Sequence, residues 1–427
     1  MLDGQWDTWL YHHDGKHYLY ILAGPGGHWD GIGMATSPDG CHWTELGKVL
    51  NKAEGVTWLG TGFTWKSPNF ERDKRFFLNF SEWRGPRQTI FFAESIDLVH
   101  WKRLPDDYEF QQDERWYERN GRWDCIYTIP REGGGLYGYW TATPKPETAG
   151  RFGFGQSLDG VRWEALRPPK VEGVGEGEVG AVEKLGERYY MMFGTGGKMV
   201  TLVAGRPEGP FRTAKKNFIL LAGDTYFSRF FPTPGGMLVN HHSMAAGGVF
   251  FAPLKRAVVD PEGTLRLAWW EGNEKLKHEA INVKQSPPGP RQASPIAVLE
   301  NVFDSRNGLV LEGTMSLPAS ADARPRGLYL DSGDGKGTAI YVGPGGVSRI
   351  GPVSADGSGF VCKERTDREA NFGATARFRL LSKGPLLEFY LNDFLMHCYG
   401  MSKEATGRIG MIGGGSQDAI RDVKAWR

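Results

Sequence analysis

Several features that define other classes of protein are missing from this sequence of 427 residues. Neither sign of charge is in excess, with 51 basic and 50 acidic residues, so nucleic acid is not an expected partner. No apolar run approaches the roughly 18 residues of a membrane span. The four cysteines form no Cys-x-x-Cys pair and indicate neither a zinc site nor a disulfide framework. We expect no nucleic acid, membrane, metal or cofactor to be involved, and the composition does not indicate an oligomeric state.

The first residues, Met1-Leu2-Asp3-Gly4, also lack the basic and apolar segments of a signal peptide. This favours a cytoplasmic protein. A secreted chain whose signal had been removed would begin in the same way.

Long segments with apolar residues at helical spacing are scarce, whereas turn-forming and aromatic residues are abundant. The chain has 60 glycines and 25 prolines, and 13% of its residues are aromatic. Such a composition is typical of short strands joined by turns. The length and a hydrophobic content of 40% are sufficient for two domains with large cores. We therefore predict an all-β protein.

A short motif recurs three times in the first half of the chain. Serine, aspartate and tryptophan keep identical offsets in copies about 60 residues apart, and the copies are Ser37-Pro38-Asp39-Gly40-Cys41-His42-Trp43, Ser95-Ile96-Asp97-Leu98-Val99-His100-Trp101 and Ser157-Leu158-Asp159-Gly160-Val161-Arg162-Trp163. The aspartate can bond its own backbone in a turn. We expect the three tryptophans to occupy equivalent buried positions on outer strands, which is a structural role.

Each repeat also contains an aromatic strand, and a fifth such strand follows the three motif copies. The five segments are 18–22, 76–80, 136–141, 189–193 and 237–241. Units of about 50 to 60 residues with roughly four strands each are typical of propeller blades. The prediction is a five-bladed β-propeller over residues 1–280, followed by a linker at 281–295 and a β-sandwich domain over 296–427. The linker is rich in proline, and alternating runs at 308–315, 386–393 and 408–412 indicate the strands of the sandwich.

Acidic residues occupy equivalent places in two of the repeats. Asp7 stands nine residues before Lys16, which opens one aromatic strand, and Glu178 stands nine residues before Glu187, which opens another. Asp124 lies at nearly the same place in the third repeat. Because the innermost strand of every blade lines one channel, we predict that Asp7, Asp124 and Glu178 converge and act together. Paired carboxylates perform acid and base chemistry on sugars.

Rings and basic groups near these positions are candidates for holding a sugar. Aromatic rings stack on sugar faces, and polar groups fix the orientation of a ligand. The predicted substrate-binding residues are Trp6, Trp65, Glu82, Arg122, Trp123, Tyr226, Arg229 and His241.

Two alternatives concern the strand that carries Glu178. Glu176 is a rival for its role, because residues two apart on a strand share a face. Glu183 has the opposite parity, so we expect it on the outside of its blade. His241 and His242 are adjacent and should point to opposite faces, so they are not expected to bind one metal ion, although one of them could face the pocket.

The order of the three acids and the sandwich that follows them resemble glycoside hydrolase family 32, and its relative family 43. Both families use a five-bladed propeller with an acid on an inner strand of the first blade, a second aspartate and then a glutamate. The run Glu388-Phe389-Tyr390-Leu391-Asn392-Asp393 is similar to a sandwich strand of family 32. The resemblance spans nearly the whole chain.

The individual motifs differ from those of family 32. Trp6-Asp7-Thr8-Trp9 replaces Asn-Asp-Pro-Asn, Arg122-Trp123-Asp124 replaces Arg-Asp-Pro, and Glu178-Val179 replaces Glu-Cys, whereas Glu178-Val179-Gly180 partly matches the Glu-Gly-Pro of family 43. The resemblance implies a divergent glycoside hydrolase that releases a terminal furanosyl unit, most simply a β-fructofuranoside, with retention of configuration. Glu178 would be the proton donor and Asp124 a stabiliser of the sugar. Asp7 would be ionised and act as the nucleophile, or as the base that activates water if the reaction inverts configuration. The alternatives are glycosyl transfer or phosphorolysis on the same fold, and a carbohydrate-binding propeller without turnover.

Overall fold

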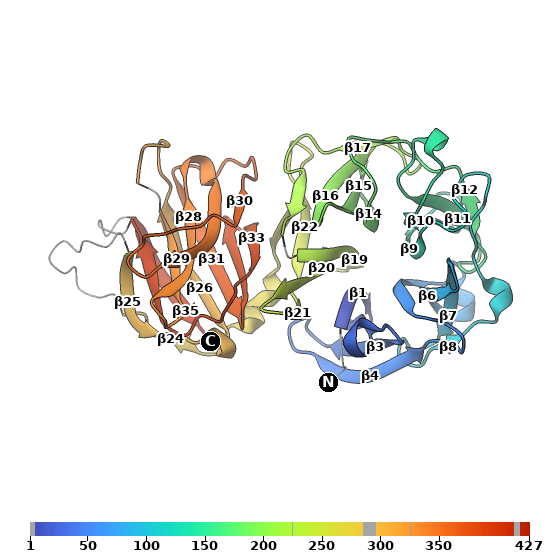
Figure 1. Cartoon of the computed structure of the whole chain (residues 1–427), viewed down its shortest axis with the longest axis horizontal. Helices are drawn as coiled ribbons and strands as arrows, with labels where there is room; N and C mark the ends of the chain where they lie inside the picture. Colours follow the sequence, from blue (N-terminus) through green and yellow to red (C-terminus); the bar gives the residue numbers. More distant parts are fainter. Residues whose placement is uncertain (1–4, 224, 285–295, 325, 414–418) are drawn as a thin grey trace. The chain divides into compact units, whose positions relative to one another are not determined.

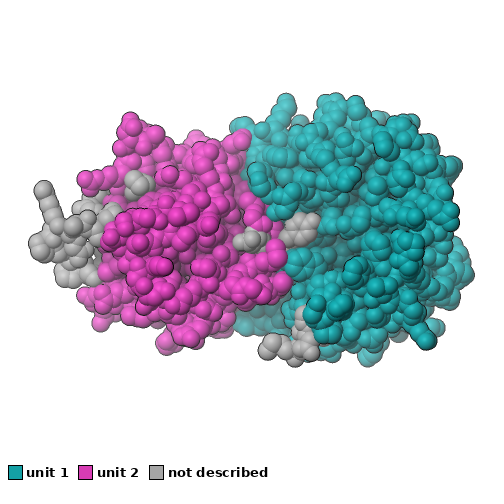
Figure 2. All heavy atoms as spheres, in the orientation of Figure 1, with its two compact units in different colours: residues 1–220, 226–242, 259–265 teal, residues 221–225, 243–258, 266–427 magenta. Residues whose placement is uncertain are grey.

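The computed structural model describes residues 5–223, 225–284, 296–324, 326–413 and 419–427. Contacts divide the chain into two compact units, which are coloured separately in Figure 2. Unit 1 comprises residues 1–220, 226–242 and 259–265, and unit 2 comprises 221–225, 243–258 and 266–427. Most of the predicted linker at 281–295 lies outside the described residues. None of the described helices is long and apolar enough to cross a membrane.

Unit 1 is a five-bladed β-propeller whose sheets surround a common axis (Figure 1). The first blade consists of β1 (Gln5–His13), β2 (Lys16–Ala23), β3 (Gly31–Ser37) and β4 (Thr44–Asn51). The second consists of β5 (Leu59–Lys66), β6 (Phe76–Arg84), β7 (Arg87–Ser95) and β8 (Lys102–Arg103). The third consists of β9 (Trp123–Pro130), β10 (Leu136–Ala142), β11 (Gly153–Ser157) and β12 (Glu164–Leu166). In each of these blades the strands pair in chain order.

The fourth blade differs from the first three because it includes a parallel strand pair. Its main strands are β14 (Glu178–Leu185), β15 (Arg188–Thr195), β16 (Lys198–Ala204) and β17 (Phe211–Thr213), with β13 (Val171–Glu172) parallel to β17 and β18 (Ile219–Leu221) beside β16. The fifth blade begins with β19 (Thr225–Thr233) and β20 (Gly236–Ala245). The five predicted aromatic segments are therefore the second strands β2, β6, β10, β15 and β20. They are buried because each lies in the middle of its blade.

The repeated serine and aspartate form the predicted turns. In the first copy, the Ser37 hydroxyl accepts the N–H of Gly40, and the Asp39 carboxylate accepts the N–H groups of Cys41 and His42. The other two copies make equivalent bonds. The predicted position of the tryptophans needs a correction. Each is only half-buried and lies one residue before its outer strand, where it packs against a ring of an inner or middle strand.

Helical segments are short and lie in the connections between strands. One α-helical turn, α1 (Phe70–Asp73), joins β5 to β6. The 3-10 turns are η1 (Pro25–Gly27), η2 (Asp106–Tyr108), η3 (Pro146–Thr148), η4 (Glu271–Leu276), η5 (Ser305–Asn307) and η6 (Pro344–Gly346).

Unit 2 contains the β-sandwich. One of its sheets has the order β22-β23-β33-β32-β31-β26-β35-β24, and the other has the order β25-β34-β27-β28-β29-β30. Leucine, isoleucine and phenylalanine side chains of both sheets form one buried core, as expected where two sheets pack face to face. The strands are β21 (Gly248–Phe251), β22 (Lys255–Val259), β23 (Leu265–Trp269), β24 (Ala280–Ile281), β25 (Ile296–Val302), β26 (Leu309–Ser316), β27 (Arg326–Asp331), β28 (Lys336–Val342), β29 (Ser348–Ser354), β30 (Glu364–Thr366), β31 (Thr375–Lys383), β32 (Leu386–Leu391), β33 (Phe394–Gly400), β34 (Arg408–Ile412) and β35 (Ile420–Trp426).

Candidate active site

The inner strands of the first four blades are interrupted by β-bulges close to the point where each strand begins. The regular pairing skips Asp7 in β1, Gly60 and Thr61 in β5, Cys125 and Ile126 in β9, and Gly180 in β14. A bulge bends its strand and changes the direction of the adjacent side chains, and bulges are frequent beside active sites. Four blades therefore carry the same local distortion around one axis.

Side chains of neighbouring blades bond backbone groups at the bulges or directly beside them. Asn79 of the second blade accepts the N–H of Ile126 and donates to the Ile126 carbonyl. Thr141 of the third blade accepts the N–H of Val179, and Asn240 of the fifth blade donates to the carbonyl of Thr8. An unpaired buried backbone group is costly. These contacts hold the bulges in one conformation.

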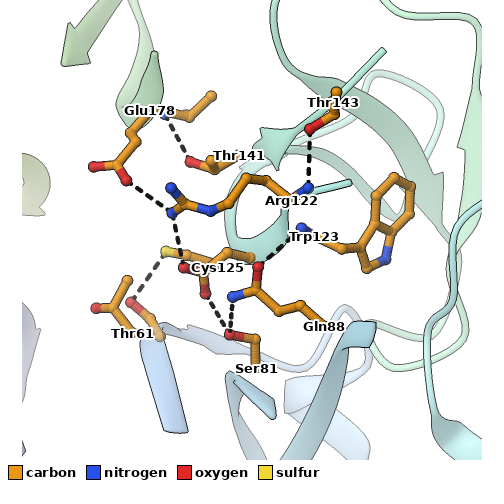
Figure 3. A network of polar contacts seen from close by, with 12 residues as sticks. Thr61, Ser81, Gln88, Arg122, Trp123, Cys125, Thr141, Thr143 and Glu178 are labelled. Carbon is orange, nitrogen blue, oxygen red and sulfur yellow. Dashed lines mark hydrogen bonds and ion pairs between the residues drawn. The ribbon is translucent and has the colours of Figure 1, made fainter. Parts of the chain in front are cut away.

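Three predicted acids meet at these bulges. The Arg122 guanidinium lies 2.7 Å from Glu178 Oε1 and 3.4 Å from Asp124 Oδ2, so it bridges acids of the third and fourth blades. Figure 3 shows Arg122 extending toward Glu178. The charges of Glu178, Asp124 and Arg122 all act on Asp7, which is half-buried and has a buried Oδ1. The structure thus brings Asp7, Asp124 and Glu178 together, whereas Glu176 is exposed and precedes β14.

Asp124 is held in place by the second blade. Its Oδ1 accepts a hydrogen bond of 2.6 Å from Ser81. Figure 3 shows that Ser81 in turn accepts one from Gln88. Gly60 lies directly against this pair, because a Cβ at that position would be 2.1 Å from Ser81 Oγ and 2.7 Å from Asp124 Oδ1. Only glycine leaves room for the Asp124 carboxyl there. Burial raises the pKa of Asp124, and Arg122 opposes this effect.

Asp7 has the least favourable surroundings of the three acids. Burial and, to a smaller extent, the charge of Glu178 raise its pKa to about 7, although Arg229 acts in the opposite direction. Its Oδ1 is buried and has no hydrogen-bond partner among the described residues. Asp7 is therefore harder to ionise than an exposed aspartate, and its predicted role as an ionised nucleophile requires nearby positive charge.

Three of the predicted sugar-binding residues are packing residues instead. Trp65 is buried against Phe77, Phe92 and Trp163. It follows the β5 bulge by several residues, so its ring packs between blades. Trp123 has no exposed surface and donates its indole N–H to the Phe110 carbonyl.

Glu82 is the third of these corrections. It has no exposed side chain and pairs with the guanidinium groups of Arg84 and Arg103. These ion pairs give it a structural role within the second blade. Strand alternation could not reveal these structural roles. Trp65, Trp123 and Glu82 are close in sequence to residues at the pocket, but their side chains point into blade interiors.

The other predicted binding residues have different outcomes. Trp6 is half-buried beside the bulge, and its ring lies 4.8 Å from that of His242 and 6.3 Å from that of Trp29. Because adjacent strand residues alternate in direction, His242 and not His241 packs on Trp6. Burial lowers the pKa of His242 to about 3, so this imidazole is neutral. The side chain of Tyr226 lies outside the described residues.

Near Trp6, the structure adds two tryptophans that the sequence analysis did not select, Trp29 and Trp58. The Trp29 carbonyl accepts the N–H of Leu59, the residue after Trp58, and the Trp58 ring packs edge-on against Trp83 at 6.2 Å. Trp58 is 40% exposed, so its ring is accessible. A tryptophan in the loop before an inner strand was the signal that could have identified it.

Glu183 is also placed differently from its expected position. Because Gly180 is a bulge, the parity of β14 reverses after it, and Glu183 lies on the same face of the strand as Glu178. Its carboxylate accepts a hydrogen bond of 2.7 Å from Tyr127, whose ring packs at 4.2 Å against Phe63.

No protein-family model and no curated protein matches the sequence. Solved structures share the fold over the entire chain. Sucrose-6-phosphate hydrolase from Lactobacillus gasseri matches with a TM-score of 0.72 and 13% identity, covering 100% of this chain and 90% of that one. Fructan 1-exohydrolase IIa from Cichorium intybus gives 0.74 and 13%, covering 100% and 95%. The family 32 β-fructofuranosidase from Bombyx mori gives 0.72 and 13%, covering 100% and 91%. The chain has the propeller-plus-sandwich fold of these enzymes.

Proposed function

We propose that this protein is a glycoside hydrolase that releases a terminal furanosyl unit through Asp7, Asp124 and Glu178. The observation that carries the proposal is the convergence of these three acids at the bulged ends of inner strands, with Arg122 bonded to two of them. A sugar-binding propeller needs rings but has no use for three mutually repelling carboxyl groups. Like charges that are kept together against their repulsion are typical of catalytic sites.

The substrate class is proposed from the fold and the rings at the site. Structures of this fold have been solved with sucrose, 1-kestose and fructosylnystose. The tryptophans Trp6, Trp29 and Trp58 provide the apolar faces on which sugar rings stack. We therefore propose an oligosaccharide or glycoside that ends in a β-fructofuranosyl unit, and arabinofuranosides or galactofuranosides are the less favoured candidates.

Each acid has a proposed role. Glu178 donates a proton to the glycosidic oxygen as the bond to the anomeric carbon breaks, and the Asp7 carboxylate attacks that carbon to form a glycosyl ester. Glu178 then removes a proton from water, which cleaves the ester and restores Asp7. Asp124 binds sugar hydroxyls and stabilises the positive charge that develops on the ring. Arg122 contacts Glu178, and a bound glycosidic oxygen would take its place.

The proposal is tested with purified full-length protein and a panel of chromogenic furanosides and pyranosides together with sucrose and 1-kestose. Release of a single furanose type supports it. Binding of a sugar without turnover by wild-type protein would instead identify a carbohydrate-binding propeller. Proton NMR of the first product distinguishes a retained anomer, expected for attack by Asp7, from an inverted one, and products extended by an acceptor would identify transfer.

A further inference from the structure

Arg229 was expected to contact sugar, but its position excludes this. It is in the middle of β19, its side chain has no exposed surface, and it is among the largest fully buried side chains of the chain. Strand residues advance by about 3.3 Å each, so Arg229 lies well inside the channel.

The guanidinium group of Arg229 is bound by the bulges of three other blades. It donates to the Gly180 carbonyl at 3.0 Å, to Cys125 Sγ at 2.7 Å and to Thr61 Oγ1 at 3.5 Å. Gly180, Cys125 and Thr61 are all residues that the regular strand pairing skips. Gly180 also approaches β19 closely, because a Cβ there would be 2.4 Å from the Ser228 carbonyl oxygen. The distortions that direct the acids therefore also form the binding site of this cation.

All three of these partners are uncharged. A buried guanidinium without a carboxylate partner is unfavourable unless other charges compensate for it. Its Nε is buried with no partner among the described residues, as is Oδ1 of Asp7. The negative charges that act with it are those of Asp7 and Asp124. Arg229 thus belongs electrostatically to the acids although it bonds neither of them.

The charges facing Asp7 can be followed blade by blade. Glu178 comes from the fourth blade, Asp124 and Arg122 from the third, and Arg229 from the fifth. The neighbouring His242 is neutral because burial lowers its pKa. Arg122 is already bonded to both Asp124 and Glu178. Arg229 is therefore the cation available to stabilise a charge on Asp7, which the proposed attack requires.

We propose that Arg229 is a positioning residue that touches no substrate and, from beneath the acids, keeps Asp7 in the ionised form needed for attack. This inference rests on the proposed function for its consequence in catalysis. It explains why the bulges of three blades converge on one guanidinium group. Loss of the charge should impair the ionisation of Asp7 without weakening sugar binding.

The test is a titration of Asp7 in the unliganded full-length protein. Carboxyl carbons of aspartate are labelled with ¹³C, and the Asp7 signal is assigned by its absence in Asp7→Asn. In the neutral variants Arg229→Met and Arg229→Gln, the midpoint of Asp7 should rise by about one pH unit or more, whereas Arg229→Lys, which retains the charge, should move it less. Arg368→Met is the matched control, because it removes another buried guanidinium that is bonded to the carbonyl oxygens of Leu395 and Met396.

The pH dependence of turnover supplies a second measurement. In both neutral variants the acidic limb of kcat/KM should move to higher pH by the same amount, while KM at high pH stays within about twofold of wild type. An unchanged Asp7 midpoint in a folded neutral variant would overturn the inference, as would a rise in KM with an unchanged pH profile. Arg229→Gln keeps a donor for Gly180 and serves if Arg229→Met does not fold. A wild-type protein without glycosidase activity would refute the proposed function, but the titration would still decide the role of Arg229.

Discussion

The propeller channel and the sandwich both bury carboxyl groups, but they satisfy them differently. In the sandwich, Glu388 has no exposed side chain and is bonded by Lys255 and by the Tyr390 hydroxyl. In the channel, Asp7 has a buried oxygen with no partner in the described part of the chain, and its pKa is raised to about 7. A buried acid with its partners in place stabilises a specific structure. A buried acid without such partners is destabilised in its ionised form, and groups of this kind are typical of catalytic sites.

The largest expected effect comes from removing the proposed proton donor. Glu178→Gln should lower kcat/KM on natural glycosides by about 10²–10⁴-fold, because no proton reaches the leaving oxygen. Activated aryl glycosides, whose leaving groups need little protonation, should be affected less. The matched control is Glu176→Gln, two residues earlier and exposed, which should retain activity. If Glu176→Gln loses activity and Glu178→Gln retains it, Glu176 is the proton donor.

Breaking the paired acid of the sandwich should affect stability instead. Glu388→Gln leaves the Lys255 charge buried without its carboxylate, so the free energy of unfolding should fall by about 3–5 kcal/mol. Urea unfolding of the full chain measures this. The double variant with Lys255→Met removes both charges and should recover part of the loss. If Glu388→Gln is as stable as wild type, the pair contributes nothing to stability. The contrast drawn between Glu388 and Asp7 would then be wrong.

Neutralising Asp7, in contrast, should increase the free energy of unfolding. The folded pKa of Asp7 is about 7, above the value of 3.8 for an unperturbed aspartate, so the folded state binds the proton more tightly. Its ionisation therefore costs stability as the pH rises from about 4 to 7, and this cost is complete above pH 7. Asp7→Asn should consequently be more stable than wild type at pH 8.5 by about 2 kcal/mol, while losing turnover. At pH 4 the difference should disappear.

The same raised pKa predicts the acidic limb of the pH profile. Because attack requires ionised Asp7, kcat/KM should rise with pH through about 7 and fall about tenfold for each unit below it. Initial rates between pH 5 and 9 test this in buffers of constant ionic strength. A profile that is flat from pH 5 to 7 would show that Asp7 is already ionised in the active free enzyme.

Glu183 is intermediate between Glu388 and Asp7 in how well its carboxyl is bonded. Its substitution should give the smallest change in stability. Burial raises its pKa to about 7, although the Tyr127 hydroxyl bonds it. Glu183→Gln should therefore stabilise the protein at pH 8.5 by about 1 kcal/mol, with turnover unchanged. Thermal unfolding at pH 5 and 8.5 shows the sign. A large loss of turnover would mean that the base of the channel takes part in the reaction.

The sequence by itself determined the repeat, and with it much of the fold. The turns at Asp39, Asp97 and Asp159 are local, because each aspartate bonds backbone groups two or three residues away. The aromatic second strands follow from composition and alternation. The equivalent offsets of Asp7 and Glu178 placed two acids on one axis without knowledge of any contact, since a propeller brings inner strands together by symmetry.

Only the tertiary structure decided which side chains face the pocket. A bulge shifts strand parity by one residue and depends on the partner strand, so the position of Glu183 could not be derived from alternation. Trp65 packs against Trp163 of the next blade, and Trp123 is bonded to the Phe110 carbonyl, so both are packing residues. Arg229 is fully buried and is bonded by the bulges of three other blades. The protonation of Asp7 likewise depends on charges brought together from three other blades. These properties arise from contacts distant in sequence, whereas a sequence pattern reports only the preferences of its own segment.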